Sequence, residues 1–212
     1  MAQELGRITK PEVESFKAGR RLFLVPLVYS FPDAPAEYTE KFELYWRQVE
    51  EHIANLESKL GKVTCVYHES ISSGGEDGLK LLEKLSPRSC QIARQKCQDG
   101  ARFEALEDKE LAAECMDWER CLLIGLASEA ALQKVSELYI EAARKRYEHI
   151  SKRIDDTLAD GEVGVLFIRE GHMVQFPKGV DVFSVAPPAL DELHRWLRDR
   201  SRSTGGKPDA EK

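Results

Sequence analysis

The sequence predicts a three-layer α/β fold with a sheet of four or five mostly parallel strands, in one domain over residues 1–200. An apolar run at 22–28 is followed by a long amphipathic helix and by a second run at 63–67, which together make a βαβ unit. The run at 163–168 is apolar at almost every position, as is typical of a central strand covered on both faces. With 212 residues, 42% of them hydrophobic and 32% charged, the chain can bury one well-packed core.

The first predicted strand contains Pro26, which cannot donate a hydrogen bond to a neighbouring strand. We therefore expect this strand either to lie at an edge of the sheet or to end at the proline. The helix after it has apolar residues three or four positions apart, with one adjacent pair, and Gly61 follows its last turn as a C′ residue. These apolar residues are Tyr38, Phe42, Tyr45, Trp46, Val49, Ile53, Leu56 and Leu60.

The middle of the chain is predicted to be helical, with helices at 77–85 and 108–123 and another between them. We expect the segment of about 77–124 to form a helical insertion or cap over one end of the sheet. A long helix over 128–161 then carries one apolar stripe and an opposite charged face, the pattern of an amphipathic surface helix.

The end of the chain is predicted to contain a hairpin, a helix and a tail. Apolar runs at 173–176 and 180–185 are separated by Pro177-Lys178-Gly179, and we interpret them as a C-terminal hairpin. A last amphipathic helix follows, and residues 201–212 are predicted to be a disordered tail because they lack large apolar side chains.

Composition excludes some classes of partner. The chain has 31 basic and 37 acidic side chains, a formal net charge of −6, which opposes a phosphate backbone or an anionic lipid surface. Neither nucleic acid nor a membrane is therefore expected as a partner. The first twenty residues contain no apolar secretory segment, so we expect a cytoplasmic location and reduced thiols at the five cysteines.

Candidate site residues follow two of the predicted strands. Ligands of α/β sheets bind outside the carboxyl ends of the strands, and His68 and Glu69 follow the second strand, while Arg169 and His172 follow the late apolar strand. Imidazole and carboxylate groups suit a divalent metal or general acid–base chemistry. If the strands are neighbours, we predict a metal site formed by His68, Glu69 and His172. The alternative is that both histidines are solvated or structural turn residues.

The order of these elements resembles the superfamily of TraB-type pheromone-shutdown proteins, ChaN-like haem-uptake lipoproteins and erythromycin esterases. The resemblance implies metal binding or hydrolysis by two Gly-x-x-His boxes with an acidic residue and an arginine between them. On this chain it implies Glu69 as the acidic residue, His172 as the histidine of the second box and Arg120 as the arginine. The first box is missing, because residues 24–30 contain neither glycine nor histidine, and Gly171 directly precedes His172. A member of this superfamily with that pattern has lost part of its site.

The helix at 108–123 offers further candidates. At about 100° per residue, its apolar positions cluster around Cys115, Glu119 flanks this face and Asp117 points away. We therefore expect Glu119 to be the inward carboxylate, whereas Asp117 and Arg120 have the spacing of a surface pair.

Four of the cysteines lie within 32 residues and define a further hypothesis, a zinc or iron–sulfur site. They are Cys90, Cys97, Cys115 and Cys121. No pair of them has the CxxC spacing of a typical metal site, which favours ordinary buried thiols.

The sequence thus leaves three functions open and does not decide whether the chain is an enzyme. The first is a metal-assisted, hydrolase-like pocket or a degenerate relative of one, with Glu69, His172 and Arg120 as catalytic residues and a divalent metal as cofactor. The second is a non-catalytic protein-interaction module, either a homo-oligomer or the partner of another protein. The third is a cysteine-ligated metal or iron–sulfur protein.

Overall fold

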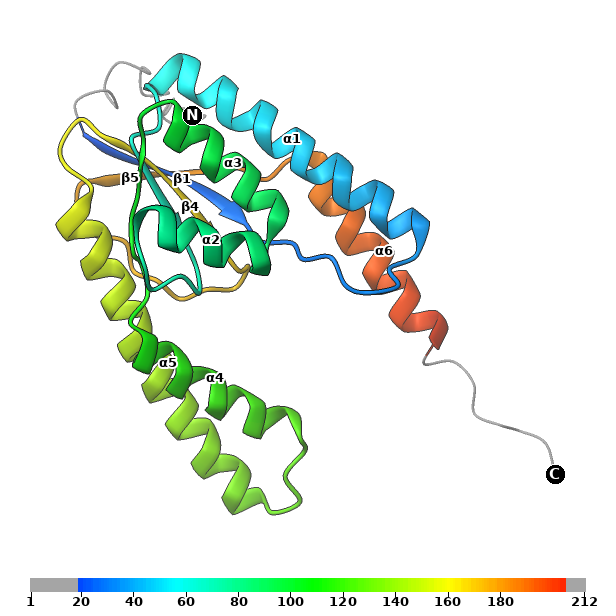
Figure 1. Ribbon diagram of the computed structural model, residues 1–212. Coiled ribbons are helices and arrows are strands. Elements are labelled where there is room, and N and C mark those ends of the chain that lie inside the picture. Colours follow the sequence, from blue (N-terminus) through cyan, green and yellow to red (C-terminus); the bar gives the residue numbers. More distant parts are fainter. Residues whose placement is uncertain (1–18, 205–212) are drawn as a thin grey trace, which may run out of the picture.

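The computed structural model describes residues 19–204, which form five parallel strands and six helices in three layers (Figure 1). The sheet has the strand order β3-β2-β4-β1-β5, which confirms the predicted fold class. Its strands are β1 (Arg20–Pro26), β2 (Cys65–His68), β3 (Arg102–Phe103), β4 (Val163–Ile168) and β5 (Val180–Ser184). The helices are α1 (Ala36–Leu60), α2 (Gly75–Leu85), α3 (Pro87–Gln98), α4 (Lys109–Leu123), α5 (Glu129–Thr157) and α6 (Pro188–Thr204).

β4 is the central strand, as its sequence predicts. All six of its residues are buried, and it pairs with β1 on one side and with β2 on the other. β1 is not an edge strand, because β5 pairs with its other side. It ends at Pro26, the second of the two expected outcomes, and the missing N–H of proline matters least at a strand end.

Helices cover both faces of the sheet. On one face, residues of α1, α2, α3 and α6 share the larger core cluster, in which the ring of Trp46 lies 6.2 Å from that of Phe167. On the other face, Ile150 and Ile154 of α5 pack with Leu166 of β4. Successive strand residues point to opposite faces, so Leu166 lies in the cluster under α5 and Phe167 lies in the larger cluster on the other face. Full burial of each such side chain contributes about 1.5–3 kcal/mol.

The predicted C-terminal hairpin does not form. Residues 173–176 are not a strand, and β5 pairs with β1 in parallel. β4 already has a neighbour on each side, so no strand can fold back onto it. The chain between β4 and β5 instead crosses the sheet face that α5 covers, where Val174 is buried and Phe176 packs against the same cluster. Residues 173–176 therefore have alternating apolar side chains because Val174 and Phe176 pack against this cluster, although the segment is not a strand.

The segment 77–124, predicted as one helical cap, is divided between two parts of the molecule. α2 and α3 pack over the sheet, and α4 pairs with α5. Between them lies β3, whose two residues are too few for a periodic pattern. The disordered tail was predicted to begin at residue 201, but residues 201–204 belong to α6. Residues 1–18 and 205–212 lie outside the described residues.

α4 and the N-terminal half of α5 form a helical hairpin that projects away from the sheet (Figure 1). The fully buried cluster of this α4–α5 hairpin consists of Cys115, Ala142 and Ala143. The C-terminal half of α5 packs on the sheet instead. Between residues 19 and 204, no helix combines the length and apolar character needed to cross a bilayer.

Candidate functional site

The carboxyl ends of β1, β2 and β4 meet at one edge of the sheet, where the connections diverge. β4 lies between β1 and β2. The chain leaves β1 and β2 toward helices on one face, but it leaves β4 across the opposite face. Adjacent parallel strands with diverging connections leave a crevice, which is where α/β proteins bind ligands. The polar residues at this edge therefore define the candidate site.

Glu69 follows β2 directly and is a deeply buried carboxylate at this edge, with a side chain that is 1% exposed. It accepts hydrogen bonds from Nη2 of Arg146 at 3.1 Å and from the backbone N–H of Arg169 at 2.6 Å. The Nε–H of Arg169 donates a third. The sequence predicts Glu69 as a metal-binding or catalytic carboxylate at this edge, but its oxygens are already occupied by two arginines.

The same arginines bind two further glutamates. The Nε–H of Arg146 donates to both carboxylate oxygens of buried Glu107, at 3.1 and 3.0 Å. Nη1 of Arg169 lies 3.2 Å from Oε1 of Glu119, the inward carboxylate expected on α4. We call these five residues the anchor network, since they join the ends of β2 and β4 to α4 and α5. It connects the projecting hairpin to the sheet.

The anchor network keeps Glu69 ionised. Burial raises the pKa of Glu69, but the N–H of Arg169 and the two guanidinium groups lower it more, so the pKa of this carboxyl lies below its ordinary value. The three carboxylates and two guanidinium groups have a formal charge of −1. A carboxylate with a lowered pKa and three donors is a poor general base, because protonating it would break these bonds. Its geometry suits a structural anchor.

His68 points to the other face of the sheet. Its Nδ1 donates to the backbone oxygen of Glu69 at 2.5 Å, and its Nε2 lies 3.0 Å from Oγ of Ser89 on α3. The ring stacks on Phe167 at 5.8 Å, and burial lowers the pKa of His68 to about 4. Both ring nitrogens are engaged and the residue is 1% exposed, so His68 is a buried structural residue and not the solvated turn residue of the alternative interpretation. Adjacent residues of a strand cannot chelate one ion from opposite faces.

His172 lies at the same edge as Glu69. It is partly buried, its ring packs edge-on against Phe176 at 5.7 Å, and its Nδ1 has no hydrogen-bond partner among the described residues. Burial lowers the pKa of His172, while the Glu69 carboxylate acts in the opposite direction. Arg120 is separate from this group, because it is exposed and pairs with Asp117 at 3.1 Å. The structure thus brings Glu69 and His172 to one edge but leaves His68 and Arg120 elsewhere.

No metal-binding group is assembled within the described part of the chain. Between residues 19 and 204, no three histidine, cysteine, aspartate or glutamate side chains are placed to hold one ion. The five cysteines are free thiols. Cys90 belongs to the large core cluster and Cys115 to the α4–α5 hairpin. The predicted set of His68, Glu69 and His172 is not brought together.

Sequence reasoning missed the two central members of the anchor network, Arg146 and Glu107. Arg146 had a detectable signal, because it lies on the buried stripe of α5, four residues after Ala142 and four before Ile150. A charged residue within an apolar stripe requires a buried partner. Glu107 has no such signal, since it lies in a loop before the N-cap residue Asp108.

The fold and the site together define an all-parallel α/β protein with a helical hairpin anchored at the carboxyl edge of its sheet. Comparison with protein-family models, with curated proteins and with solved structures finds no match for this chain. The resemblance to the TraB, ChaN-like and erythromycin-esterase superfamily therefore stays a prediction.

Proposed function

We propose that this chain is a non-catalytic interaction protein whose α4–α5 hairpin packs against the hairpin of a second copy. The observation that carries the proposal is a set of large apolar side chains exposed on the hairpin, where Leu123 is 80% and Ile140 is 65% exposed. Met116 and Leu132 are also exposed. Monomeric proteins rarely leave so many large apolar side chains together in water.

Three of these side chains share one side of the hairpin, whereas Leu132, 11 residues before Ala143, lies only about 20° around α5 from the direction of Ala143. At about 100° per residue, Met116 and Leu123 on α4 lie roughly 80–100° around the helix from Cys115, which faces α5. Ile140 is displaced from Ala143, which faces α4, by about 60° in the same rotational sense. In an antiparallel pair of helices, the same sense of rotation leads to the same side. We call Met116, Leu123 and Ile140 the apolar side of the hairpin.

The opposite side is charged. Glu114 contributes to raising the pKa of Lys145, behind the larger effect of Glu141, so these groups lie near each other across the two helices. Lys145 and Glu141 form an ion pair at 2.8 Å, and both are exposed. The charged side is suited to water, whereas the apolar side, which also carries the exposed ion pair of Arg144 with Glu148, is suited to a partner.

A second hairpin is the occupant that best completes this structure. The buried cluster of the hairpin contains one cysteine and two alanines, and the aromatic side chains packed against it, Trp118, Tyr139 and Tyr147, are only partly buried, so two helices alone leave apolar area exposed. Stable bundles usually contain four helices around a shared core. The hairpin projects from the sheet, so two copies can meet by a two-fold axis without contact between their sheets (Figure 1). Pairing would bury both apolar sides.

The hydrolase-like alternative has less support. It requires Glu69 to bind a metal or accept a proton, yet that carboxylate already accepts three hydrogen bonds from two arginines. It also requires His68, whose ring nitrogens are both engaged on the other face of the sheet.

Light scattering coupled to gel filtration tests the proposal. We expect the wild-type chain to have the mass of two chains at about 100 µM, and Leu123→Glu with Ile140→Glu to have the mass of one, because charges placed in an apolar interface disrupt it. Ala113→Glu with Ala130→Glu adds the same charge at exposed positions about 60–80° around each helix from the apolar side and should leave the dimer intact. A monomeric wild type, or a dimer that survives the Leu123 and Ile140 changes with helical circular dichroism unaltered, would contradict it.

A further inference from the structure

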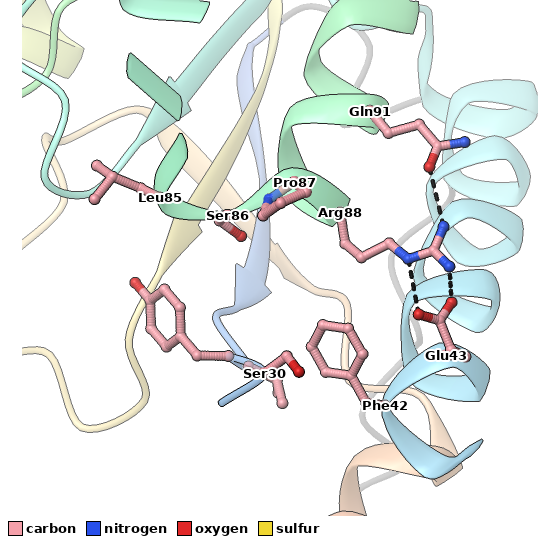
Figure 2. A pocket seen from close by; sticks show the side chains of 10 residues that line it. Ser30, Phe42, Glu43, Leu85, Ser86, Pro87, Arg88 and Gln91 are labelled. Atoms are coloured by element: carbon pink, nitrogen blue, oxygen red, sulfur yellow. Dashed lines mark hydrogen bonds and ion pairs between the residues drawn. The ribbon is translucent and has the colours of Figure 1, made fainter. Parts of the chain in front are cut away.

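A second concave feature lies at the carboxyl end of β1, apart from the hairpin and next to the anchor network, whose charges act on the lining residue Tyr29. It is a cavity of about 350 Å³ between the segment after β1, helix α1 and the junction of α2 with α3. Figure 2 shows the side chains that surround it. This volume is at the lower end of the range of small-molecule sites, about 300–1,000 Å³.

The walls of the cavity are mostly apolar. Val28 follows β1, Phe42 extends from α1, and Leu85 and Pro87 come from the junction of α2 with α3. The aromatic ring of Tyr29 completes this lining. An apolar lining of this kind suits the hydrocarbon or aromatic body of a ligand.

The polar groups of the cavity belong mainly to the N-terminal end of α3. Cys90 makes the first helical hydrogen bond, from its N–H to the carbonyl of Ser86 at 3.0 Å. The N–H groups of Arg88 and Ser89 precede that bond and therefore have no acceptor within the helix, while Pro87 has no N–H. Unpaired N–H groups and the positive end of the helix dipole attract an anion.

Ser86 supplies an independent indication of a ligand. The residue is only 5% exposed and lines the cavity, and Figure 2 shows its side chain directed into it. Ser86 is the N-cap residue of α3, but its hydroxyl does not cap the helix and has no hydrogen-bond partner among residues 19–204. The hydroxyl faces the cavity and is not engaged by the protein, so it is free to donate a hydrogen bond to a ligand there.

An ion pair closes one side of the cavity without leaving an unpaired negative charge there. Nε of Arg88 donates to Glu43 at 3.1 Å and a second guanidinium nitrogen contacts the other carboxylate oxygen (Figure 2). Nη1 of Arg88 also donates to Gln91 at 3.1 Å. Because Arg88 neutralises Glu43, the end of α3 remains attractive to an anion.

From these observations we propose that the cavity binds a small organic anion, with a carboxylate or phosphate group at the N-terminus of α3 and an apolar body against Phe42 and Tyr29. The Ser86 hydroxyl and the N–H groups of Arg88 and Ser89 would donate to the anion. This site is independent of the proposed dimer.

Amide chemical shifts of the full chain test the site. We expect phenyl phosphate or phenylacetate to shift the N–H signals of Arg88 and Ser89 below about 10 mM, and neutral benzyl alcohol to leave them unchanged. Inorganic phosphate, which lacks the apolar body, should bind at least about tenfold more weakly than phenyl phosphate. Whichever of the two aryl anions binds more tightly identifies the anionic group.

Two matched substitutions separate binding from stability. Ser86→Asp places a negative charge at the end of α3 and should weaken binding at least about tenfold, although aspartate is a favourable N-cap residue. Ser128→Asp makes the same change at the N-cap of α5 and should not alter binding. If no aryl anion shifts these amides, or if Ser86→Asp binds as tightly as the wild type, the cavity does not bind anions.

Discussion

Removal of the Glu69 carboxylate is the sharpest test of the anchor network. Glu69→Ala leaves Arg146, whose side chain is 5% exposed, with Glu107 as its remaining partner, and leaves the N–H of Arg169 without an acceptor. Breaking a buried ion pair by removing one partner costs about 3–5 kcal/mol, and we expect about 3 kcal/mol because Arg146 keeps Glu107. For a chain of this size, that loss lowers Tm by roughly 6–12 °C.

Urea unfolding followed by circular dichroism measures this change directly. Asp117→Ala is the matched control, because it removes a carboxylate from the exposed pair with Arg120 and should change the free energy of unfolding by at most about 1 kcal/mol. The pKa of Glu69 is lowered in the folded protein, so its contribution is present above its unfolded pKa of about 4.3 and is lost as pH falls through the folded value. The difference in the free energy of unfolding between the wild type and Glu69→Gln should therefore become smaller at acidic pH. If Glu69→Ala destabilises no more than Asp117→Ala, the anchor network does not stabilise the fold.

Two further predictions concern the core. Burial lowers the pKa of His68 to about 4, so the unfolded chain binds a proton there that the folded chain does not, and stability should fall by up to about 3 kcal/mol as pH drops from about 6.5 to about 4. In His68→Phe, the free energy of unfolding should depend less on pH in this range. If the slope is unchanged, groups other than His68 cause the pH dependence. A Cβ atom on Gly78 would lie 2.1 Å from the Ser73 carbonyl oxygen and 2.7 Å from Cε1 of Phe103, so Gly78→Ala should destabilise by about 3 kcal/mol or more. Lys80→Ala, at an exposed position of the same helix, should change stability by less than about 0.5 kcal/mol, and equal effects would show that the backbone can move to admit the methyl group.

The candidate site was predictable where local pattern carried the information. Placing ligands at the carboxyl ends of strands selected Glu69 and His172, and the helical wheel selected Glu119 over Asp117. The pattern could not show that Glu69 would be surrounded by arginines, because Arg146 is 77 residues away in sequence. His68 and Glu69 are adjacent in sequence, and their side chains point to opposite faces of the sheet. The prediction of one metal site containing both was therefore wrong, because successive side chains of a strand alternate between the two faces.

The cytoplasmic location, the absence of a nucleic-acid partner and the superfamily resemblance remain predictions. The first depends on the composition of residues 1–20, the second on net charge, and the third on the order of the elements and a few short motifs. The proposed dimer and the proposed anion site depend instead on exposed side chains and on a cavity that only the folded chain contains.

The sequence by itself determined the type and order of most elements, because an apolar residue at every third or fourth position can only be buried along a helix, and a continuous apolar run only in a covered strand. The tertiary structure alone decided the pairing of the strands. Once β1 and β2 occupied both sides of β4, the chain after β4 had to cross the sheet, and β5 paired with β1 in parallel instead of forming a hairpin. It also decided which charged groups met, since long-range ion pairs depend on distances that no local pattern encodes.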